Sequence, residues 1–418
     1  MKPTKALIAH ASDALSEALR FSGPADQAVS RHFRSHRDLG QQDRAFVAET
    51  VFAALRRRRS LAAAAQSESP YSLVLASLVR LQGFPARAVA DVVRAKDLPL
   101  LERACAARSE DQAPAVQADL PDWLWDRLVA QYGEQEARAM ALGLLAPAPM
   151  DLRANAVKAS RDDALAALRS AGVACEPTPY SPVGLRLADK PAINKQPAFI
   201  DGRVEVQDEG SQLLAAIVAP KRGEMVVDFC AGGGGKTLAL GALMRNTGRL
   251  YAFDVSAKRL AGLDPRLARS GLSNVHPVAI TTENDVRAKR LAGKIDRVLV
   301  DAPCSGFGTL RRNPDLKWRF GEKDVAELVD KQSRILASAA RLPRVGGRLV
   351  FATCSVLKEE GEAIAAKFLG AHPGYAQISC AAILAAQGIP LDTGVSLRLF
   401  PHLHRTDGFF AAAFERRT

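Results

Sequence analysis

The stretch Met225-Val-Val-Asp-Phe-Cys-Ala-Gly-Gly-Gly-Gly-Lys-Thr237 combines a short apolar run, a glycine-rich turn and the start of a helical pattern. Strands that alternate with helices are typical of a parallel sheet built from βαβ units. The sequence from Val204 onward continues this alternation and therefore predicts an α/β domain with a parallel-rich sheet. The further strand candidates are Arg249–Asp254, Val275–Ile280, Arg297–Val300 and Arg348–Thr353, and near the end of the chain Val395–Leu399 and Phe409–Phe414, which are expected to pair as an antiparallel edge.

Carboxylates and thiols follow the predicted strands. Asp228, Asp254 and Asp301 end the first, second and fourth strands, and Cys354 ends the fifth. Because ligands of parallel α/β sheets bind beyond the C-terminal strand ends, we expect the functional site there. Cys304 follows Asp301 by three residues, so both thiols are expected in one cleft, although free cysteines often serve as small buried hydrophobes. Neither motif contains a histidine, so activation of a thiol would come from helix N-termini or nearby cations.

Two interpretations of the glycine-rich turn compete. A phosphate-binding P-loop has the pattern Gly-x-x-x-x-Gly-Lys-Ser/Thr, and its first glycine would fall on Cys230 here. This mismatch disfavours nucleotide hydrolysis. In the other interpretation, backbone N–H groups of the turn approach a nucleoside cofactor. Asp254 at the next strand end would then hold ribose hydroxyls, as the acidic residue does in dinucleotide-binding folds.

The front of the chain has a different pattern. Residues 1–112 carry apolar residues at helical spacing, with glycines and prolines between the repeats. The run Arg56-Arg-Arg-Arg59 closes one predicted helix, where cations suit the helix dipole; a contact with RNA phosphates is the alternative. Residues 113–146 are expected to form a helical linker, and 204–418 the α/β domain. Between them, 147–203 reads as a small α/β segment, with strands at Met150–Arg153 and Leu185–Leu187 and a helix at Asp162–Ala171.

Composition narrows the class of partner. The chain has 418 residues, with 57 Lys and Arg against 45 Asp and Glu, and a net charge of +12. This excess favours a polyanionic partner, nucleic acid first, although a solvated basic surface would also explain it. The six cysteines lack metal-ligand spacing, so we expect free thiols, a reducing compartment and no metal. Without a signal-peptide pattern or a bilayer-spanning apolar run, a cytoplasmic monomer that binds no membrane is expected.

Three segments resemble the motifs of a known family. Asp301-Ala-Pro-Cys-Ser-Gly306, Arg311-Arg-Asn-Pro-Asp315 and Ala352-Thr-Cys-Ser355 are similar to those of RsmB/Sun-type RNA (cytosine-5) methyltransferases. The resemblance implies a Rossmann-like class I methyltransferase domain, preceded by the small α/β segment and by an all-helical NusB-like RNA-binding domain at residues 1–112. Further similar segments extend over nearly the whole chain, at Leu39–Arg44, Leu152–Asn155, Val206–Gln212, Asp228–Ala231 and Arg405–Phe410.

The resemblance also implies a cofactor, S-adenosylmethionine, and a substrate, a cytosine in RNA, with small-subunit ribosomal RNA as the expected target. Carried over to this sequence, Cys354 is the nucleophile that adds to C6 of the cytosine, and Cys304 assists breakdown of the adduct. Asp301 hydrogen-bonds the cytosine edge and lies near the cofactor. The other cofactor residues it implies are Cys230, Ala231, Gly232, Gly233, Gly234, Gly235, Lys236, Asp254 and Asp285. Candidates for RNA phosphate contacts, with surface salt bridges as the alternative, are Arg311, Arg312 and Lys317.

The sequence departs from the family pattern at two places. Asn284 replaces the glycine that usually precedes the acid at Asp285, and Gly232-Gly233 stand where Ala-Pro is common. The second change should loosen the loop without removing a ligand group, because the loop contacts are mostly backbone. A function of another class stays open beside methyl transfer, namely an RNA-binding ribosome assembly factor with a vestigial cofactor fold.

Overall fold

The computed structural model describes residues 2–418 and divides into two compact units. A helical unit contains the chain up to Pro147 together with Thr309–Glu322. An α/β unit contains Ala148–Gly308 and Lys323–Thr418. The domain predicted for 204–418 is therefore interrupted, because a segment from its interior belongs to the helical unit.

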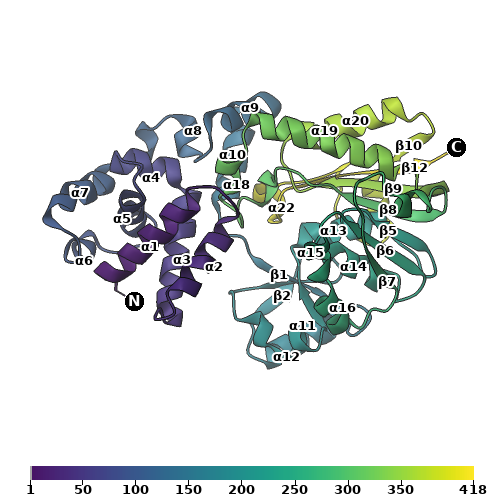
Figure 1. Ribbon diagram of the computed structural model, residues 1–418, viewed down its shortest axis with the longest axis horizontal. Helices are drawn as coiled ribbons and strands as arrows, with labels where there is room; N and C mark the ends of the chain where they lie inside the picture. The colour runs from purple at the N-terminus through teal and green to yellow at the C-terminus, as the bar shows by residue number, and fades with distance from the viewer. Residues whose placement is uncertain (1) are drawn as a thin grey trace. The chain divides into compact units, whose positions relative to one another are not determined.

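The helical unit packs around α5 (Pro70–Arg80), where Leu73, Val74, Leu75 and Leu78 are fully buried. This helix contacts α1 (Lys5–Ala18), α3 (Gln41–Arg56), α4 (Arg58–Ala65) and α7 (Leu98–Ala106) (Figure 1). The helical character predicted for this part of the chain is confirmed. The other helices of the unit are α2 (Ala25–Ser35), α6 (Ala86–Ala90), α8 (Pro114–Gln117), α9 (Asp122–Tyr132), α10 (Glu134–Leu145) and α18 (Leu316–Arg319).

The segment Thr309–Glu322 joins the helical unit through the C-terminal end of α3. Carbonyl groups in the last turn of a helix have no partner within the helix. Lys317 Nζ donates a hydrogen bond to the carbonyl oxygen of Arg56 at 2.8 Å, and Trp318 Nε1 donates to that of Leu55, also at 2.8 Å. The segment therefore supplies side chains that cap α3.

The α/β unit contains a small antiparallel sheet of strand order β2-β3-β1-β4. The two strands and the helix predicted here are present. However, β4 pairs with β1, so this sheet extends beyond the expected boundary at residue 203. Its strands are β1 (Met150–Ala154), β2 (Cys175–Pro177), β3 (Gly184–Leu187) and β4 (Val204–Val206), and its helices are α11 (Arg161–Ser170) and α12 (Pro197–Ile200).

The large sheet has the order β10-β12-β9-β8-β5-β6-β7, with β11 paired to β12. Its five strands from β7 to β9 are parallel, which confirms the predicted parallel-rich α/β fold. The order places β6 on one side of β5 and β8 on the other, so the topological switch point lies at β5. The parallel strands are β5 (Met225–Asp228), β6 (Arg249–Asp254), β7 (Val275–Ala279), β8 (Ile295–Asp301) and β9 (Pro343–Thr353).

The last strands of the chain complete the sheet in antiparallel orientation. The expected pairing of the two candidates near the C-terminus is confirmed, since β11 (Leu397–Leu399) pairs with β12 (Phe409–Arg416). The strand β12 is not an edge, however, because it lies between β9 and β10 (Tyr375–Ile378). Its side chains from Phe409 to Phe414 are all buried, as an internal position requires.

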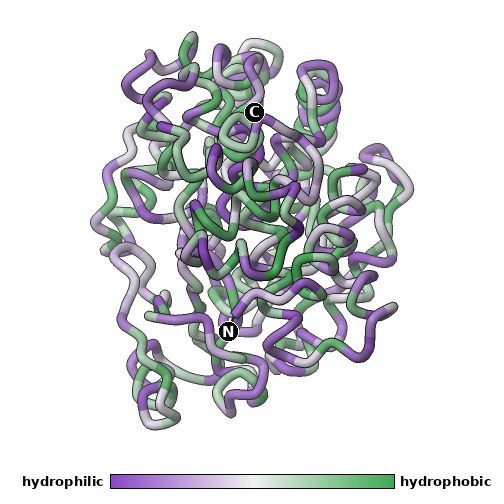
Figure 2. The backbone as a smooth tube through the Cα atoms, turned by 90° about the vertical axis from the view of Figure 1, so that its left-hand side faces the viewer, coloured by the Kyte–Doolittle hydropathy of each residue, from purple (hydrophilic) through white to green (hydrophobic). Residues whose placement is uncertain are grey.

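Helices cover both faces of the large sheet (Figure 1). Buried residues of α13 and α21 form one hydrophobic core with β5, β9 and β12, and those of α19 and α20 form another with β8, β9 and β12. Figure 2 shows hydrophobic and hydrophilic stretches interspersed along the chain. Among residues 2–418, none of the helices has the length and hydrophobicity that a membrane span requires. The helices of this unit are α13 (Glu209–Val218), α14 (Gly235–Leu243), α15 (Ala257–Ala261), α16 (Asp264–Ser270), α17 (Val286–Lys289), α19 (Glu322–Ala339), α20 (Glu362–Ala371), α21 (Cys380–Ala385) and α22 (Pro401–His404).

Candidate active site at the ends of strands β5, β8 and β9

Two thiols meet beyond the ends of adjacent strands. In the pairing of β8 with β9, Asp301 lies opposite Ala352, so the chain segments that follow both strands leave the sheet at one place. The sulfur atoms of Cys304 and Cys354 lie 3.3 Å apart. Hydrogen bonding to Cys354 and burial raise the pKa of the Cys304 thiol well above its ordinary value. Cys304 is therefore a protonated thiol at neutral pH, placed to interact with the sulfur of its neighbour.

A partly buried ion pair lies beside the thiols. Lys236 Nζ, at the start of α14, is 2.6 Å from Asp301 Oδ2 at the end of β8. Burial acts to lower the pKa of Lys236, but the Asp301 carboxylate outweighs it and holds that pKa above its usual value. The ammonium group also interacts electrostatically with Cys354. The site thus contains a permanent cation within range of one of its two thiols.

A second carboxyl group lies under the glycine-rich loop. Thr237 Oγ1 donates a hydrogen bond to Asp228 Oδ2 at 2.7 Å, while Asp228 Oδ1 is buried without a hydrogen-bond partner of ordinary geometry. Burial raises the pKa of Asp228 to about 7. Burial likewise raises the pKa of the Cys230 thiol, which makes this loop cysteine an unreactive thiol rather than a nucleophile.

The loop from Cys230 to Lys236 is fixed against the end of β6. Gly232 N donates to Asp254 Oδ2 at 2.9 Å, and Ser256 N donates to Asp254 Oδ1 at 2.7 Å. Gly234 has a φ of +81°, and a Cβ atom there would lie 2.1 Å from Leu263 Cδ1, so only glycine fits. The structure thus brings the loop and Asp254 together, as the sequence predicted for a nucleoside site.

Two arginines that sequence analysis did not single out lie over this loop. Arg259 Nη1 is 3.8 Å from Asp254 Oδ2, and Arg266 Nη1 donates to the carbonyl oxygen of Gly233. Both follow β6, on α15 and α16, in a stretch whose spacing carries no recognisable motif. They add positive charge beside the loop.

Asp285 caps the start of α17. Its carboxylate accepts five hydrogen bonds, from the backbone and side chain of Thr281 and from the backbone and guanidinium of Arg287. The Arg287 and Thr281 donors hold the pKa of Asp285 well below its usual range. Because a carboxylate has about four lone-pair directions, contact with a cofactor would require Arg287 to move.

Glu360 connects the two cysteine segments, and sequence analysis missed it. Its side chain is 0% exposed, and its Oε1 accepts from Ser305 N at 2.8 Å and from Gln332 Nε2 at 2.9 Å. Its Oε2 accepts from Ser355 Oγ at 2.6 Å and from the Ser305 hydroxyl. Thr353 Oγ1 donates to the Glu360 carbonyl at 2.9 Å. One carboxylate therefore binds the residue that follows each cysteine, and we call this arrangement the Glu360 clamp.

The three candidate phosphate contacts belong to the helical unit. Lys317 is only 2% exposed and Arg311 only 5% exposed, so the structure does not offer either side chain to a phosphate. Burial lowers the pKa of Lys317 to about 7, although the negative charge of Asp119 acts to raise it. These residues instead support the end of α3: Lys317 by its ammonium group, and Arg311 by a carbonyl oxygen that accepts from Arg56. Arg312 is partly exposed, and its RNA contact remains a prediction.

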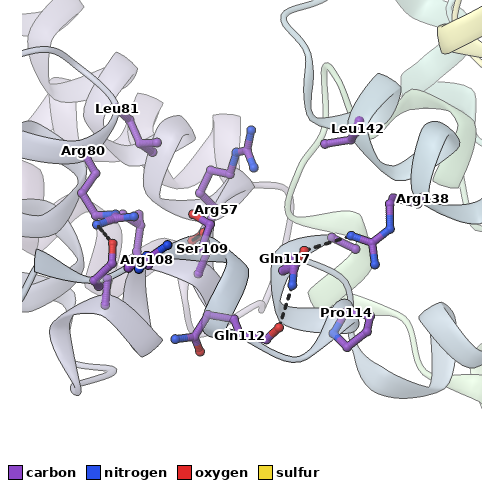
Figure 3. A pocket seen from close by; sticks show the side chains of 15 residues that line it. Arg57, Arg80, Leu81, Arg108, Ser109, Gln112, Pro114, Gln117, Arg138 and Leu142 are labelled. Atoms are coloured by element: carbon purple, nitrogen blue, oxygen red, sulfur yellow. Dashed lines mark hydrogen bonds between the residues drawn. The ribbon is translucent and has the colours of Figure 1, made fainter.

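An arginine-lined cavity of about 440 Å³ lies in the helical unit (Figure 3). Arg57, Arg80, Arg108 and Arg138 line it. The guanidinium of Arg138 donates to Gln117 Oε1 at 2.9 Å, and that of Arg57 lies 3.6 Å from an Asp119 oxygen. The cavity is therefore lined by guanidinium groups, of which those of Arg57, Arg108 and Arg138 also lie within salt-bridge distance of carboxylates.

The parallel sheet, the glycine-rich loop after β5 and the acid at the end of β6 define a Rossmann-like methyltransferase domain. Comparison with known proteins supports this class. Residues 215–415 match the family model of the 16S rRNA methyltransferase RsmB/F, and residues 120–194 match its ferredoxin-like domain. The chain belongs to the RsmB/F family of small-subunit ribosomal RNA methyltransferases.

Individual relatives agree with this assignment. Ribosomal RNA small subunit methyltransferase B of Sodalis glossinidius is 35% identical over 316 residues, which cover 73% of this chain and 70% of that protein. The "Probable ribosomal RNA small subunit methyltransferase B" of Synechocystis sp. is 31% identical and covers 94% of this chain and 95% of its own length. The crystal structure of PH0851 superposes with a TM-score of 0.78 at 26% identity, over 97% of this chain and 98% of that one.

Proposed function

We propose that this protein methylates C5 of a cytosine in small-subunit ribosomal RNA, with S-adenosylmethionine as the methyl donor. The observation that carries the proposal is the 3.3 Å separation of the Cys304 and Cys354 sulfurs at the ends of adjacent strands. C5 of cytosine is a poor nucleophile until a thiolate adds at C6 and makes C5 electron-rich. Membership in a family of ribosomal RNA methyltransferases supports RNA as the target.

Cys354 is the nucleophile of the proposed reaction. Its sulfur forms a bond to C6, and its thiol proton passes to water. The charge of Lys236 favours this assignment, because the ammonium interacts electrostatically with Cys354. Cys304 is less suited, because hydrogen bonding to Cys354 and burial raise its pKa. The target base must leave its stack to reach the thiol, which favours a loop or another single-stranded region of the RNA.

Cys304 is the group that releases the product. While the Cys354 thiol is free, its hydrogen bond with Cys304 and the burial of Cys304 raise the pKa of Cys304 and keep that thiol protonated. Once Cys354 has become a thioether, its thiol group no longer acts on the pKa of Cys304, whereas burial and the charges of Glu360 and Asp301 still raise it. Cys304 passes its own proton to water and takes the C5 proton, as the bond from C6 to sulfur breaks and the ring double bond forms again. The same thiol, 3.3 Å away, can donate to the departing Cys354 thiolate.

Asp301 and Lys236 bind and polarise the base. Asp301 meets Lys236 through Oδ2, which leaves Oδ1 to accept from the exocyclic amino group of cytosine. Negative charge develops in the ring when a thiolate adds at C6, and the partly buried ammonium of Lys236 stabilises it.

The loop from Cys230 to Lys236 and Asp254 fit the cofactor. The glycines let backbone N–H groups approach a ligand, and both oxygens of Asp254 are oriented by backbone donors at the end of β6. When bound, S-adenosylmethionine supplies the methyl group that the C5 electron pair takes, while its sulfonium–methyl bond breaks and S-adenosylhomocysteine is left. Asp285 remains a candidate adenine contact that depends on movement of Arg287.

The helical unit is proposed to bind RNA. The support is its arginine-lined cavity, together with the excess of basic residues in the whole chain. Arg57, from the run Arg56–Arg59, and Arg138 line that cavity and are the candidates for phosphate contacts.

Transfer of labelled methyl groups to 16S ribosomal RNA tests the proposal. Cys354→Ala should abolish transfer, whereas Cys105→Ala, at an exposed cysteine of the helical unit, should not change it. Full methylation by the Cys354→Ala protein would exclude the mechanism. Calorimetric titration with S-adenosylmethionine distinguishes the alternative, because an assembly factor with a vestigial fold would bind RNA and not the cofactor.

A further inference from the structure

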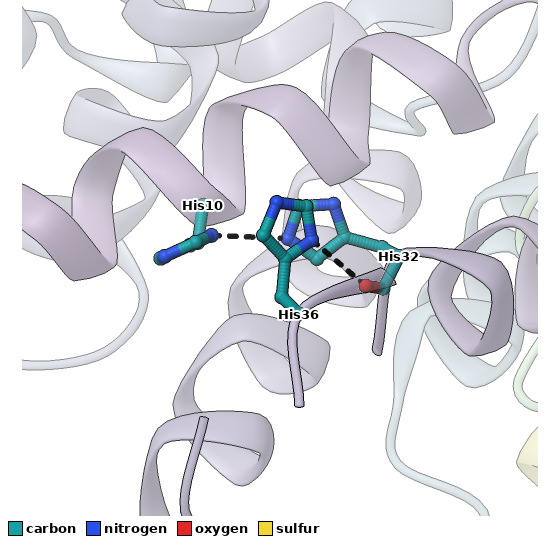
Figure 4. Close-up of side chains that lie close together, drawn as sticks. All are labelled: His10, His32 and His36. Atoms are coloured by element: carbon teal, nitrogen blue, oxygen red, sulfur yellow. Dashed lines mark hydrogen bonds between the residues drawn. The ribbon is translucent and has the colours of Figure 1, made fainter. Parts of the chain in front are cut away.

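Three of the seven histidines of the chain gather in the helical unit (Figure 4). His10 lies on α1, while His32 lies on α2 and His36 directly follows that helix. A spacing of four residues places His32 and His36 on one face. The ring centroids are 5.4 Å apart for His10 and His32, 4.8 Å for His10 and His36, and 4.2 Å for His32 and His36. The cluster thus joins two helices.

The distances between the ring nitrogens suit a metal ion. His10 Nδ1 and His32 Nε2 are 3.3 Å apart. A tetrahedral zinc ion with bonds of about 2.0–2.1 Å to nitrogen requires roughly 3.3–3.4 Å between its donor atoms. One donor atom from each of the three rings lies within 4.8 Å of the others. Rotation of His10, which is only half-buried, closes the remaining difference.

The hydrogen bond of His36 fixes which nitrogen could bind. His36 Nδ1 is 2.9 Å from the carbonyl oxygen of His32. A carbonyl oxygen only accepts, so Nδ1 carries the proton and Nε2 keeps its lone pair. Donation from the second ring nitrogen to a backbone carbonyl is the usual support of a metal-bound histidine. This feature orients the third ligand before any ion is bound.

The surroundings add negative charge and access. Asp13 and Glu17 follow His10 by three and seven residues on α1, and both interact electrostatically with His32, while Glu17 also forms an ion pair with Arg31 at 2.7 Å. His32 is 6% exposed, whereas the partly exposed His10 and His36 give an ion a path to the cluster.

We propose that His10, His32 and His36 bind Zn²⁺ or a similar borderline divalent cation, which joins α1 to α2 in the helical unit, with water at the fourth position. Imidazole ligands without carboxylate favour this class of cation over Mg²⁺ or Ca²⁺. The proposal departs from the expectation that the chain binds no metal. The sequence concealed the site, because His10 and His32 are 22 residues apart and lie on different helices.

Zn²⁺ titration against a chromophoric chelator tests the site in full-length protein that carries Cys304→Ser and Cys354→Ser, so that the thiol pair cannot compete. We expect one tight equivalent. Loss of an outer-shell partner typically weakens metal binding about 10–100-fold, so loss of a ligand in His10→Gln or His36→Gln should weaken it more than about 100-fold. His276→Gln, at an exposed histidine of β7, is the matched control and should bind as the parent does.

A second readout separates binding from misfolding. Each variant is first compared with the parent by circular dichroism without metal. Zn²⁺ should then raise the melting temperature of the parent and of His276→Gln, but not of His10→Gln or His36→Gln. A parent that does not saturate with one Zn²⁺, or His10→Gln and His36→Gln proteins that bind as tightly as the parent, would overturn the proposal and leave a hydrogen-bonded histidine cluster.

Discussion

The Glu360 clamp should control the rate of methyl transfer through the position of both thiols. Glu360→Gln keeps the shape of the side chain and one carbonyl oxygen, which can accept from Ser305 N and Gln332 Nε2 as Oε1 does now. The new amide group faces the hydroxyl groups of Ser305 and Ser355, which must turn to accept. The substitution thus preserves four hydrogen bonds, but each is then made with a neutral amide instead of a charged carboxylate.

The magnitude follows from those four bonds. A hydrogen bond to a charged acceptor is stronger than one to a neutral acceptor by roughly 1 kcal/mol, so Glu360→Gln should lower the free energy of unfolding by about 4 kcal/mol. Serines 305 and 355 directly follow the two cysteines, so a shift of the clamp moves the sulfurs. A displacement of about 1 Å costs on the order of 100-fold in rate, and we expect kcat to fall roughly 10- to 100-fold.

Steady-state methylation of 16S ribosomal RNA, beside urea unfolding, measures both effects. KM for RNA and for S-adenosylmethionine should stay unchanged, because Glu360 is fully buried and contacts neither in the proposed site. Glu359→Gln, at the partly exposed neighbouring residue, is the matched control and should keep the parent rate. A Glu360→Gln protein with the parent kcat, or one that loses only affinity for a substrate, would refute the positioning role.

Three further predictions concern buried and basic side chains. The folded-state pKa of Lys317 is about 7, below that of the exposed side chain, so the unfolded chain binds more protons between pH 7 and 10. Stability of the helical unit should therefore rise with pH in that window, by up to about 1.4 kcal/mol per pH unit, and Lys317→Met should remove this slope in urea unfolding. Lys236→Met leaves Asp301 without its ion-pair partner and should lower kcat by about 100-fold in the same transfer assay, with RNA affinity unchanged. Replacing Arg57 and Arg138 by Gln should reduce the magnitude of the slope of log binding constant against log salt concentration by about 1.4 for single-stranded RNA, measured by filter binding; an unchanged slope would contradict RNA contact at the cavity.

The repeating pattern of short apolar runs was sufficient to predict the large sheet. Runs such as Met225–Phe229 and Arg348–Thr353 are local signals, because a strand buried on both faces needs a continuous apolar sequence. Strand-end residues such as Asp254 and Cys354 could be located for the same reason. The position of β12 could not, because its neighbours β9 and β10 are chosen by packing between distant segments rather than by its own sequence.

The burial of Lys317 and the role of Glu360, which the sequence did not reveal, depend on contacts between distant residues, whereas the contacts of Asp285 are local. Lys317 resembles a surface cation in the sequence, and only its contact with the Arg56 carbonyl at the end of α3 explains its burial. Glu360 is one of several acidic residues in its segment, and its role depends on Ser305, 55 residues earlier in the chain. Asp285 matched a family position, but the neighbouring Arg287 and Thr281 occupy its lone pairs.

Mass spectrometry of the RNA–protein adduct tests the central claim most directly. Cys304→Ala protein is incubated with S-adenosylmethionine and 16S ribosomal RNA, and covalent complexes are isolated under denaturing conditions and digested. The proposed mechanism predicts a methylated cytosine attached to the peptide that contains Cys354, and no complex from the protein that also carries Cys354→Ala. A cytosine attached to any other residue, or methylated RNA produced by the protein without Cys354, would contradict the account.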